Sequence, residues 1–199
     1  MANPCLNFVL PSNGCQNAPT QGGIYEIYVT EAINVTGITI TPTTGAIDAE
    51  TEGTVTAIAR VTGTKFLRLS PKAGSTVLTQ TFENRAFGQT LSFDLNGLSQ
   101  VVRESLKQMA DCACDLVVIV FYNGDKRPDL IYGQAMDEFD NVINNSPLRL
   151  TTATFNSGQA TSDDPVVNVT LARENGVLAQ LSRHLNMSAN DIKALLTEA

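Results

Sequence analysis

Short segments in which apolar and polar residues alternate dominate most of the chain. In residues 55–61, for example, the odd-numbered positions are Val or Ala, and the even-numbered positions are polar except for Ile58. Alternation with a period of two is typical of a half-buried β-strand. Bounded by Gly, Pro or Asn, such segments predict strands over residues 24–31, 35–41, 54–62, 66–69, 76–82, 87–95, 116–122, 130–134, 148–155 and 166–171.

The segment from Leu116 to Tyr122 differs from the other strands because every residue in it is apolar or aromatic. A strand of this composition is covered on both faces, so we expect it at the centre of a sheet. The dipeptide Asn123-Gly124 follows it, and both residues tolerate the positive φ angles of a tight hairpin turn. The next strand, 130–134, is therefore its predicted antiparallel partner.

A helical period appears in two places. Between Leu98 and Ala110 the apolar residues recur at three- and four-residue steps, which predicts a helix lying across the open face of the sheet. A short apolar stripe predicts a second helix over 177–185, and Ser188 with Asp191 forms a variant capping box for a third. Two helices this short are marginal alone, so they must pack on the domain or on another subunit.

These patterns together predict a mainly β (α+β) fold. We expect an antiparallel β-sandwich or barrel with one packed helix, plus a short C-terminal helical pair. The length of 199 residues corresponds to one domain with appendages. The expected organisation is an extended N-terminal arm over 1–22, rich in Pro, Asn, Gly and Gln, a β-rich domain over 23–175, and a C-terminal helical extension over 176–199.

Charge and hydropathy narrow the possible partners. The chain carries 20 acidic and 13 basic residues, a net charge of −7, so it repels phosphate and is not expected to clamp nucleic acid. No apolar run reaches the length of a membrane-spanning helix, so no membrane partner is expected. The first residues lack the basic and apolar regions of a signal peptide, which predicts synthesis and assembly in a cytoplasm.

Four cysteines raise the question of a zinc site. Zinc knuckles separate paired ligands by two to four residues. Cys112 and Cys114 have one residue between them, and Cys5 and Cys15 have nine, so the spacing argues against zinc. Buried free thiols are the favoured interpretation, because a disulfide is disfavoured in a reducing compartment.

Other residues and motifs typical of catalytic or binding sites are equally sparse. His184 is the single histidine, it falls in the helix predicted over 177–185, and no Gly-x-Ser-x-Gly motif supplies a serine partner. Phosphate-binding, dinucleotide-binding and His-Glu-x-x-His motifs are absent from the sequence. We therefore predict no catalytic, cofactor-binding or metal-binding residue, no cofactor, and no enzymatic activity. Carboxylates do cluster, but beside loop-forming residues that favour solvated loops, at Asp137, Glu138, Asp140, Asp163 and Asp164.

The order of these segments resembles a family of virion proteins. The early strand Ile27-Tyr28-Val29, the aromatic strand pair within 81–95, and the helix and hairpin from Leu98 to Gly133 carry the likeness. In this order they resemble tail-tube-type and ring-type structural proteins of tailed phages infecting Bacteroidota, crAss-like phages included. The likeness covers residues 22–173, and the C-terminal helical pair departs from it.

The resemblance implies a subunit of a phage tail tube or of a neck or tail ring. Copies of the chain would close into a ring, usually hexameric, which contacts other tail or neck proteins in the virion. DNA would pass through the channel with weakly repulsive, non-specific contact. The alternative is a carbohydrate- or receptor-binding β-sandwich at the tail tip. Such modules commonly stack sugars on Trp, whereas this chain has no Trp and 6% aromatic residues.

The expected contacts between subunits are the hairpin tip at 123–128 and the arm at 1–22, in which Leu6, Phe8, Val9 and Leu10 are available for docking. Deleting residues 1–22 should leave a folded domain whose assembly is weakened, because the arm contributes little core of its own. Circular dichroism and light scattering of the truncated protein measure the two effects separately. Unfolding of the truncated domain would instead show that the arm belongs to the core.

Overall fold

The structure is a computed structural model of the chain. It describes residues 23–42, 53–83, 86–96, 100–111, 115–122, 128–131, 134–136, 142–145, 148–157, 165–172 and 183–196. Sequential antiparallel strands dominate these residues, with two α-helices and one short 3-10 helix. The mainly β (α+β) fold expected from the sequence is confirmed.

The chain order of the elements begins with β1 (Ile24–Glu31), the 3-10 helix η1 (Ala32–Asn34), β2 (Val35–Pro42), β3 (Gly53–Arg60) and β4 (Leu67–Leu69). It continues through β5 (Val77–Glu83), β6 (Ala86–Asn96), α1 (Gln100–Asp111), β7 (Leu116–Tyr122), β8 (Asp129–Ile131), β9 (Gln134–Met136), β10 (Val142–Asn145), β11 (Arg149–Asn156), β12 (Val166–Ala172), β13 (Arg183–His184) and α2 (Ala189–Leu195).

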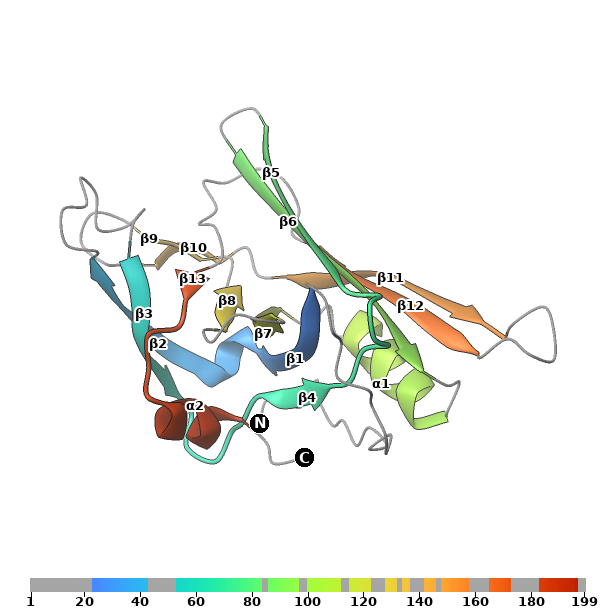
Figure 1. Cartoon of the computed structure of the whole chain (residues 1–199), viewed down its shortest axis with the longest axis horizontal. Helices are drawn as coiled ribbons and strands as arrows, with labels where there is room; N and C mark the ends of the chain where they lie inside the picture. The colour runs from blue at the N-terminus through green and yellow to red at the C-terminus, as the bar shows by residue number, and fades with distance from the viewer. Residues whose placement is uncertain are drawn as a thin grey trace.

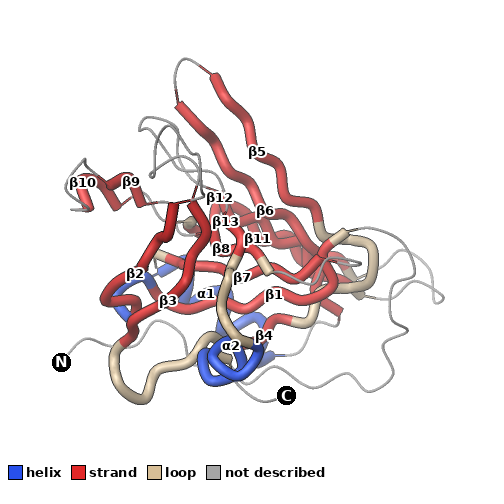
Figure 2. The backbone as a smooth tube through the Cα atoms, turned by 60° about the vertical axis from the view of Figure 1, so that its left-hand side comes forward, coloured by secondary structure: helices blue, strands red, loops and turns tan. Residues whose placement is uncertain are grey.

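Two larger sheets and two hairpins form the layers of the molecule. The central sheet has the strand order β13-β8-β7-β1-β4, and the outer sheet has the order β11-β12-β6-β5. The hairpins are β2–β3 and β9–β10. In Figure 1 α1, β11 and β12 lie on the right of the central sheet, the β5–β6 hairpin rises above it, and β2, β3 and α2 lie on its left. The tube drawing from another side shows the same β5–β6 hairpin extending away from the other elements (Figure 2).

The first core fills the space between one face of the central sheet, the outer sheet and α1. Helix α1 contributes Val102, Leu106 and Met109, which share one stripe because they recur at three- and four-residue steps. The sequence therefore predicts this helix and its packing face correctly. The buried residues of the first core are Ile24, Ile27, Val29, Leu69, Leu91, Phe93, Leu95, Val102, Leu106, Met109, Leu116, Val118, Val120, Leu148, Val167, Val169 and Leu171.

The second core covers the opposite face of the central sheet. Hairpin β2–β3 and the C-terminal residues 185–196 form this cover, so the C-terminal segment packs on its own chain. The backbone N–H of Asn186 donates to the carbonyl of Val55 at 2.7 Å, and that of Phe66 donates to Leu195 at 2.9 Å. The buried residues of the second core are Tyr28, Val35, Val55, Ile58, Phe66, Val117, Ile119, Leu185, Leu195 and Leu196.

Bulges in β1 and in the β2–β3 ladder help decide which side chains enter these cores. In β1 the register shifts between Ile24 and Glu26, so Ile24 and Ile27 both face the first core although they are three residues apart. The β2–β3 ladder shifts between Val35 and Gly37 and again beside Thr39.

The alternation in residues 55–61 consequently does not identify the buried face of β3. Val55 and Ile58 are buried together, whereas Ala57, Ala59 and Val61 are exposed. One extra residue in a bulged strand exchanges the inward and outward positions beyond it. The physical reason is the register shift opposite Thr39, which the alternating pattern does not reveal.

The prediction of a C-terminal helical pair is confirmed for one helix and wrong for part of the other. Helix α2 begins after Ser188, whose hydroxyl accepts a hydrogen bond from the backbone N–H of Asp191 at 3.2 Å, as the capping pattern predicts. The helix expected over 177–185 is wrong for its last residues, because Arg183 and His184 pair with β8 as strand β13. Tertiary strand pairing overrides the helical periodicity there. Residues 177–182 lie outside the described residues, and strands β9 and β10 are additions that the sequence pattern did not predict.

Leu185→Ala should lower the free energy of unfolding by about 2–5 kcal/mol, because Leu185 is fully buried in the second core. Ile33→Ala is the control, since the Ile33 side chain is 66% exposed and its loss should change stability by less than about 0.5 kcal/mol. Urea denaturation of both variants measures the difference. Equally small losses of stability in the two variants would show that the C-terminal segment contributes nothing to the core.

Candidate functional site

Most of the residues that the sequence singled out lie outside the described residues. This holds for the arm at 1–22, the hairpin tip at 123–127, all four cysteines and both carboxylate clusters. Pro128, at the end of the predicted hairpin tip, is buried, and its carbonyl accepts a hydrogen bond from the backbone N–H of Leu185 at 2.8 Å. The last residue of that tip is therefore a structural contact within the chain.

His184 lies in β13 and its side chain is exposed. Its position in an extended strand, rather than in the expected helix, places it at the edge of the central sheet. Within the described residues, no group of three or more His, Cys, Asp or Glu side chains is arranged to hold a metal ion. No helix in the same part of the chain is long and apolar enough to cross a membrane.

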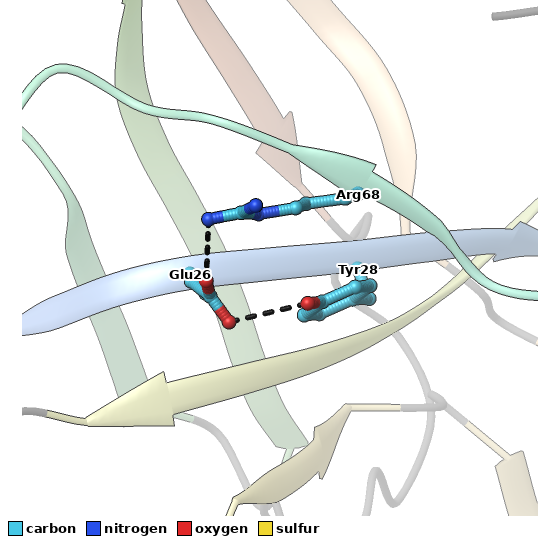
Figure 3. Close-up of polar contacts among 3 residues, drawn as sticks. All are labelled: Glu26, Tyr28 and Arg68. Carbon is cyan, nitrogen blue, oxygen red and sulfur yellow. Dashed lines mark hydrogen bonds and ion pairs between the residues drawn. The ribbon is translucent and has the colours of Figure 1, made fainter. Parts of the chain in front are cut away.

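A polar cluster joins β1 to β4 at the edge of the central sheet (Figure 3). One terminal guanidinium nitrogen of Arg68 lies 2.5 Å from Oε1 of Glu26, and the Tyr28 hydroxyl donates to Oε2 of the same carboxylate at 3.2 Å. Tyr28 and Arg68 are directly opposite in the antiparallel ladder. Glu26 and Tyr28 are two residues apart in the regular part of β1, after the bulge, so they lie on the same face and one carboxylate receives both partners.

Burial makes the phenol of this cluster a poor acid. It raises the pKa of Tyr28 from 10.0 to about 12, and the negative charge of Glu26 adds to the effect. Burial and the same carboxylate also raise the pKa of Tyr25. The Phe121 ring packs edge-on against both tyrosines, with ring centres 6.2 Å from Tyr25 and 5.5 Å from Tyr28.

The chemistry of this cluster suits strand cohesion better than catalysis. A tyrosine whose pKa is about 12 stays protonated at neutral pH, so it donates a hydrogen bond and does not act as a base. The Glu26 carboxylate is engaged by Tyr28 and Arg68. A cross-strand pair of this kind contributes roughly 0.2–1 kcal/mol to the sheet. Sequence reasoning missed the cluster because Glu26 and Arg68 are 42 residues apart.

The outer sheet ends in two strands that lack an outer partner within the described residues. These strands are β11 at one edge and β5 at the other. Neither Val77–Phe82 nor Leu150–Asn156 contains a charged residue. Natural proteins protect exposed edges with Lys, Pro, bulges or a covering element, and a free edge is otherwise a template for another strand. A bulge between Leu150 and Thr152 is present in β11.

An apolar groove lies between α1 and β11, with a volume of about 280 Å³. Its floor includes Leu106 of the first core and the partly buried Leu150 and Ala153, which pack on that core. Phe155 is 43% exposed at one end, where the guanidinium carbon of Arg103 lies 5.6 Å from the centre of its ring. The first core thus reaches the surface beside an edge strand that has no outer partner among the described residues.

The chain matches no protein-family model, and no curated protein or solved structure is significantly similar to it. The resemblance to phage ring proteins therefore stays a prediction from the sequence.

Alkaline pH should destabilise the protein through Tyr28. The folded state holds the Tyr28 proton up to about pH 12, whereas the unfolded chain releases it near pH 10.0, so stability is retained below pH 10.0 and falls as the pH rises toward 12. Tyr28→Phe removes this titration and should flatten the decline. The urea midpoints of wild type and variant, measured from pH 10.0 to about 12, test this prediction. Equal declines in the two proteins would contradict the assignment of the stability loss to Tyr28.

Proposed function

We propose that this protein is a structural subunit of a phage tail tube or of a neck or tail ring, located in the virion. The observation that carries the proposal is the outer sheet, because both of its edge strands are uncharged over most of their length and lack an outer partner within the described residues. A sheet of this kind can be extended from both sides by other copies of the chain.

The two free edges belong to different strands, which favours a head-to-tail assembly. A contact that joins the β5 edge of one subunit to the β11 edge of the next, directly or through an added strand, would be heterologous, and a heterologous contact closes into a ring when the rotation between subunits allows it. An isologous contact of β5 with β5 would instead stop at a dimer. The arrangement of edges therefore supports a cyclic assembly over a simple pair.

The face of the outer sheet that is turned away from the core supports a channel wall for DNA. Residues opposite each other in the ladder share a face, and this face carries mostly Thr, Ser and Asn, with Val77 exposed at its edge. Asp94 adds a negative charge and accepts a hydrogen bond from Asn168. Arg149 lies at the edge and pairs with Asp115 at 2.6 Å. A polar wall with few free cations keeps phosphates from binding tightly.

Purified protein should form rings or stacked rings. Light scattering measures the mass, and negative-stain images of the same fractions give the diameter, which separates a narrow tube from a wider neck ring. Thr79→Lys, on the exposed face of β5, should lower the assembled fraction, because a lysine on an edge strand disfavours strand pairing. Thr62→Lys, in an exposed turn, is the control with the same change of charge.

A monomer at every concentration would contradict self-assembly into a ring. That result would favour the tail-tip binding module, which needs no contact between copies.

A further inference from the structure

We propose that the groove between α1 and β11 receives residues Leu6–Leu10 from the N-terminal segment of a neighbouring copy, which adds a strand to the free edge of β11. This inference deepens the proposed ring function and rests on it, because it names the contact that would join one subunit to the next. Its basis is the groove, the free edge beside it and the pattern of the N-terminal residues.

The groove continues the first core to the surface. Leu106 is buried in that core, while Leu150 and Ala153 are partly buried against it and also line the groove. Apolar surface that opens next to an edge strand is costly to leave in water, so a partner that fills it gains burial. The exposed Phe155 ring marks one end of this surface.

Strand addition at β11 would place side chains in this groove. An added strand gains main-chain hydrogen bonds from the sheet edge, and its alternate side chains enter pockets along one face. Leu150, Ala153 and Phe155 are on the core side of β11, since their ladder partners Leu171, Val169 and Val167 are all buried in the first core. Every second side chain of an added strand would therefore point into the apolar groove.

The N-terminal segment has the pattern that this site requires. Leu6, Phe8 and Leu10 alternate with Asn7 and Val9, so one face of an extended strand would be wholly apolar. Residues 1–22 contain no Asp, Glu, Lys, Arg or His, so no side-chain charge would be buried. The twelve residues from 11 to 22 can span up to about 40 Å between this segment and Gly23, where the described residues begin.

The size of the groove favours a protein side chain over a small molecule. Ligand pockets typically measure about 300–1,000 Å³ and enclose most of the ligand. The volume here is about 280 Å³, and no cluster of polar groups converges on it: of its lining residues, Arg103 covers Phe155 and Lys107 pairs with Asp111. An aromatic residue such as Phe8 with an aliphatic neighbour matches this space better than a polar ligand does.

Disulfide trapping tests the contact directly. Thr152 is exposed on β11 and lines the groove, and Cys5 directly precedes the proposed strand. Thr152→Cys should therefore give covalently linked dimers and larger species after mild oxidation of the full-length protein. Mass spectrometry of digested species should identify the peptide pair joining Cys5 to position 152. Cys5→Ser in the same background should abolish that pair while leaving the other native cysteines in place.

Matched variants test the energetics of the same contact. Phe8→Asp should weaken association at least tenfold, whereas Asn7→Asp, with the same added charge on the opposite face of the strand, should not. On the groove side, Ala110→Arg blocks the site from an exposed helix position, and Gln108→Arg is its control on another face of α1. Circular dichroism of each variant confirms that the fold is kept, so that a loss of assembly reports on the contact.

The outcomes separate this inference from the ring function. Rings that form equally well with Phe8→Asp, and yield no link between Cys5 and position 152, would overturn the inference and leave the ring proposal standing. A link found only within single chains would also overturn it. Covalent dimers through these two positions without any ring would support the inference and count against the ring.

Discussion

The burial of both faces of β7 is the constraint on which the rest of the structure depends. From Leu116 to Val120 every side chain is fully buried, with alternate residues in the first and the second core. A single packed sheet would leave one of these rows in water, at a cost of about 25 cal/mol for each Å² of apolar surface. The protein therefore needs two covers: the outer sheet with α1 on one side, and β2–β3 with residues 185–196 on the other.

The second cover is small, and polar contacts hold it in place. The Arg60 guanidinium donates to the carbonyl of Ala194 at 2.6 Å, which ties the end of β3 to α2. Beside it, the Glu26, Tyr28 and Arg68 cluster fastens the short edge strand β4 to β1. Polar groups at the margin of an apolar core specify which strands pair there, because a slipped register would leave them without partners.

The strands, the long helix and the cap of α2 could be predicted because their signals are local. Alternation, three- and four-residue steps, and the Ser188 cap each lie within a few residues. The buried face of β3 could not be predicted, because a bulge opposite Thr39 changes which residues point inward without changing the alternation of apolar and polar residues. The polar cluster and the groove depend on still longer separations. Glu26 meets Arg68 across 42 residues, and the groove joins Arg103 to Phe155, so only the folded sheet brings either pair together.

The place of residues 185–196 in the second core also sets an order in time. A ribosome synthesises β1 and β7 well before this segment. The side chains of Tyr28, Val117 and Ile119 are therefore only partly covered until Leu185, Leu195 and Leu196 have emerged. Contacts of such long sequence separation slow folding, because the intervening chain must first be ordered. The second core of a growing chain is therefore completed only after Leu185, Leu195 and Leu196 have been synthesised.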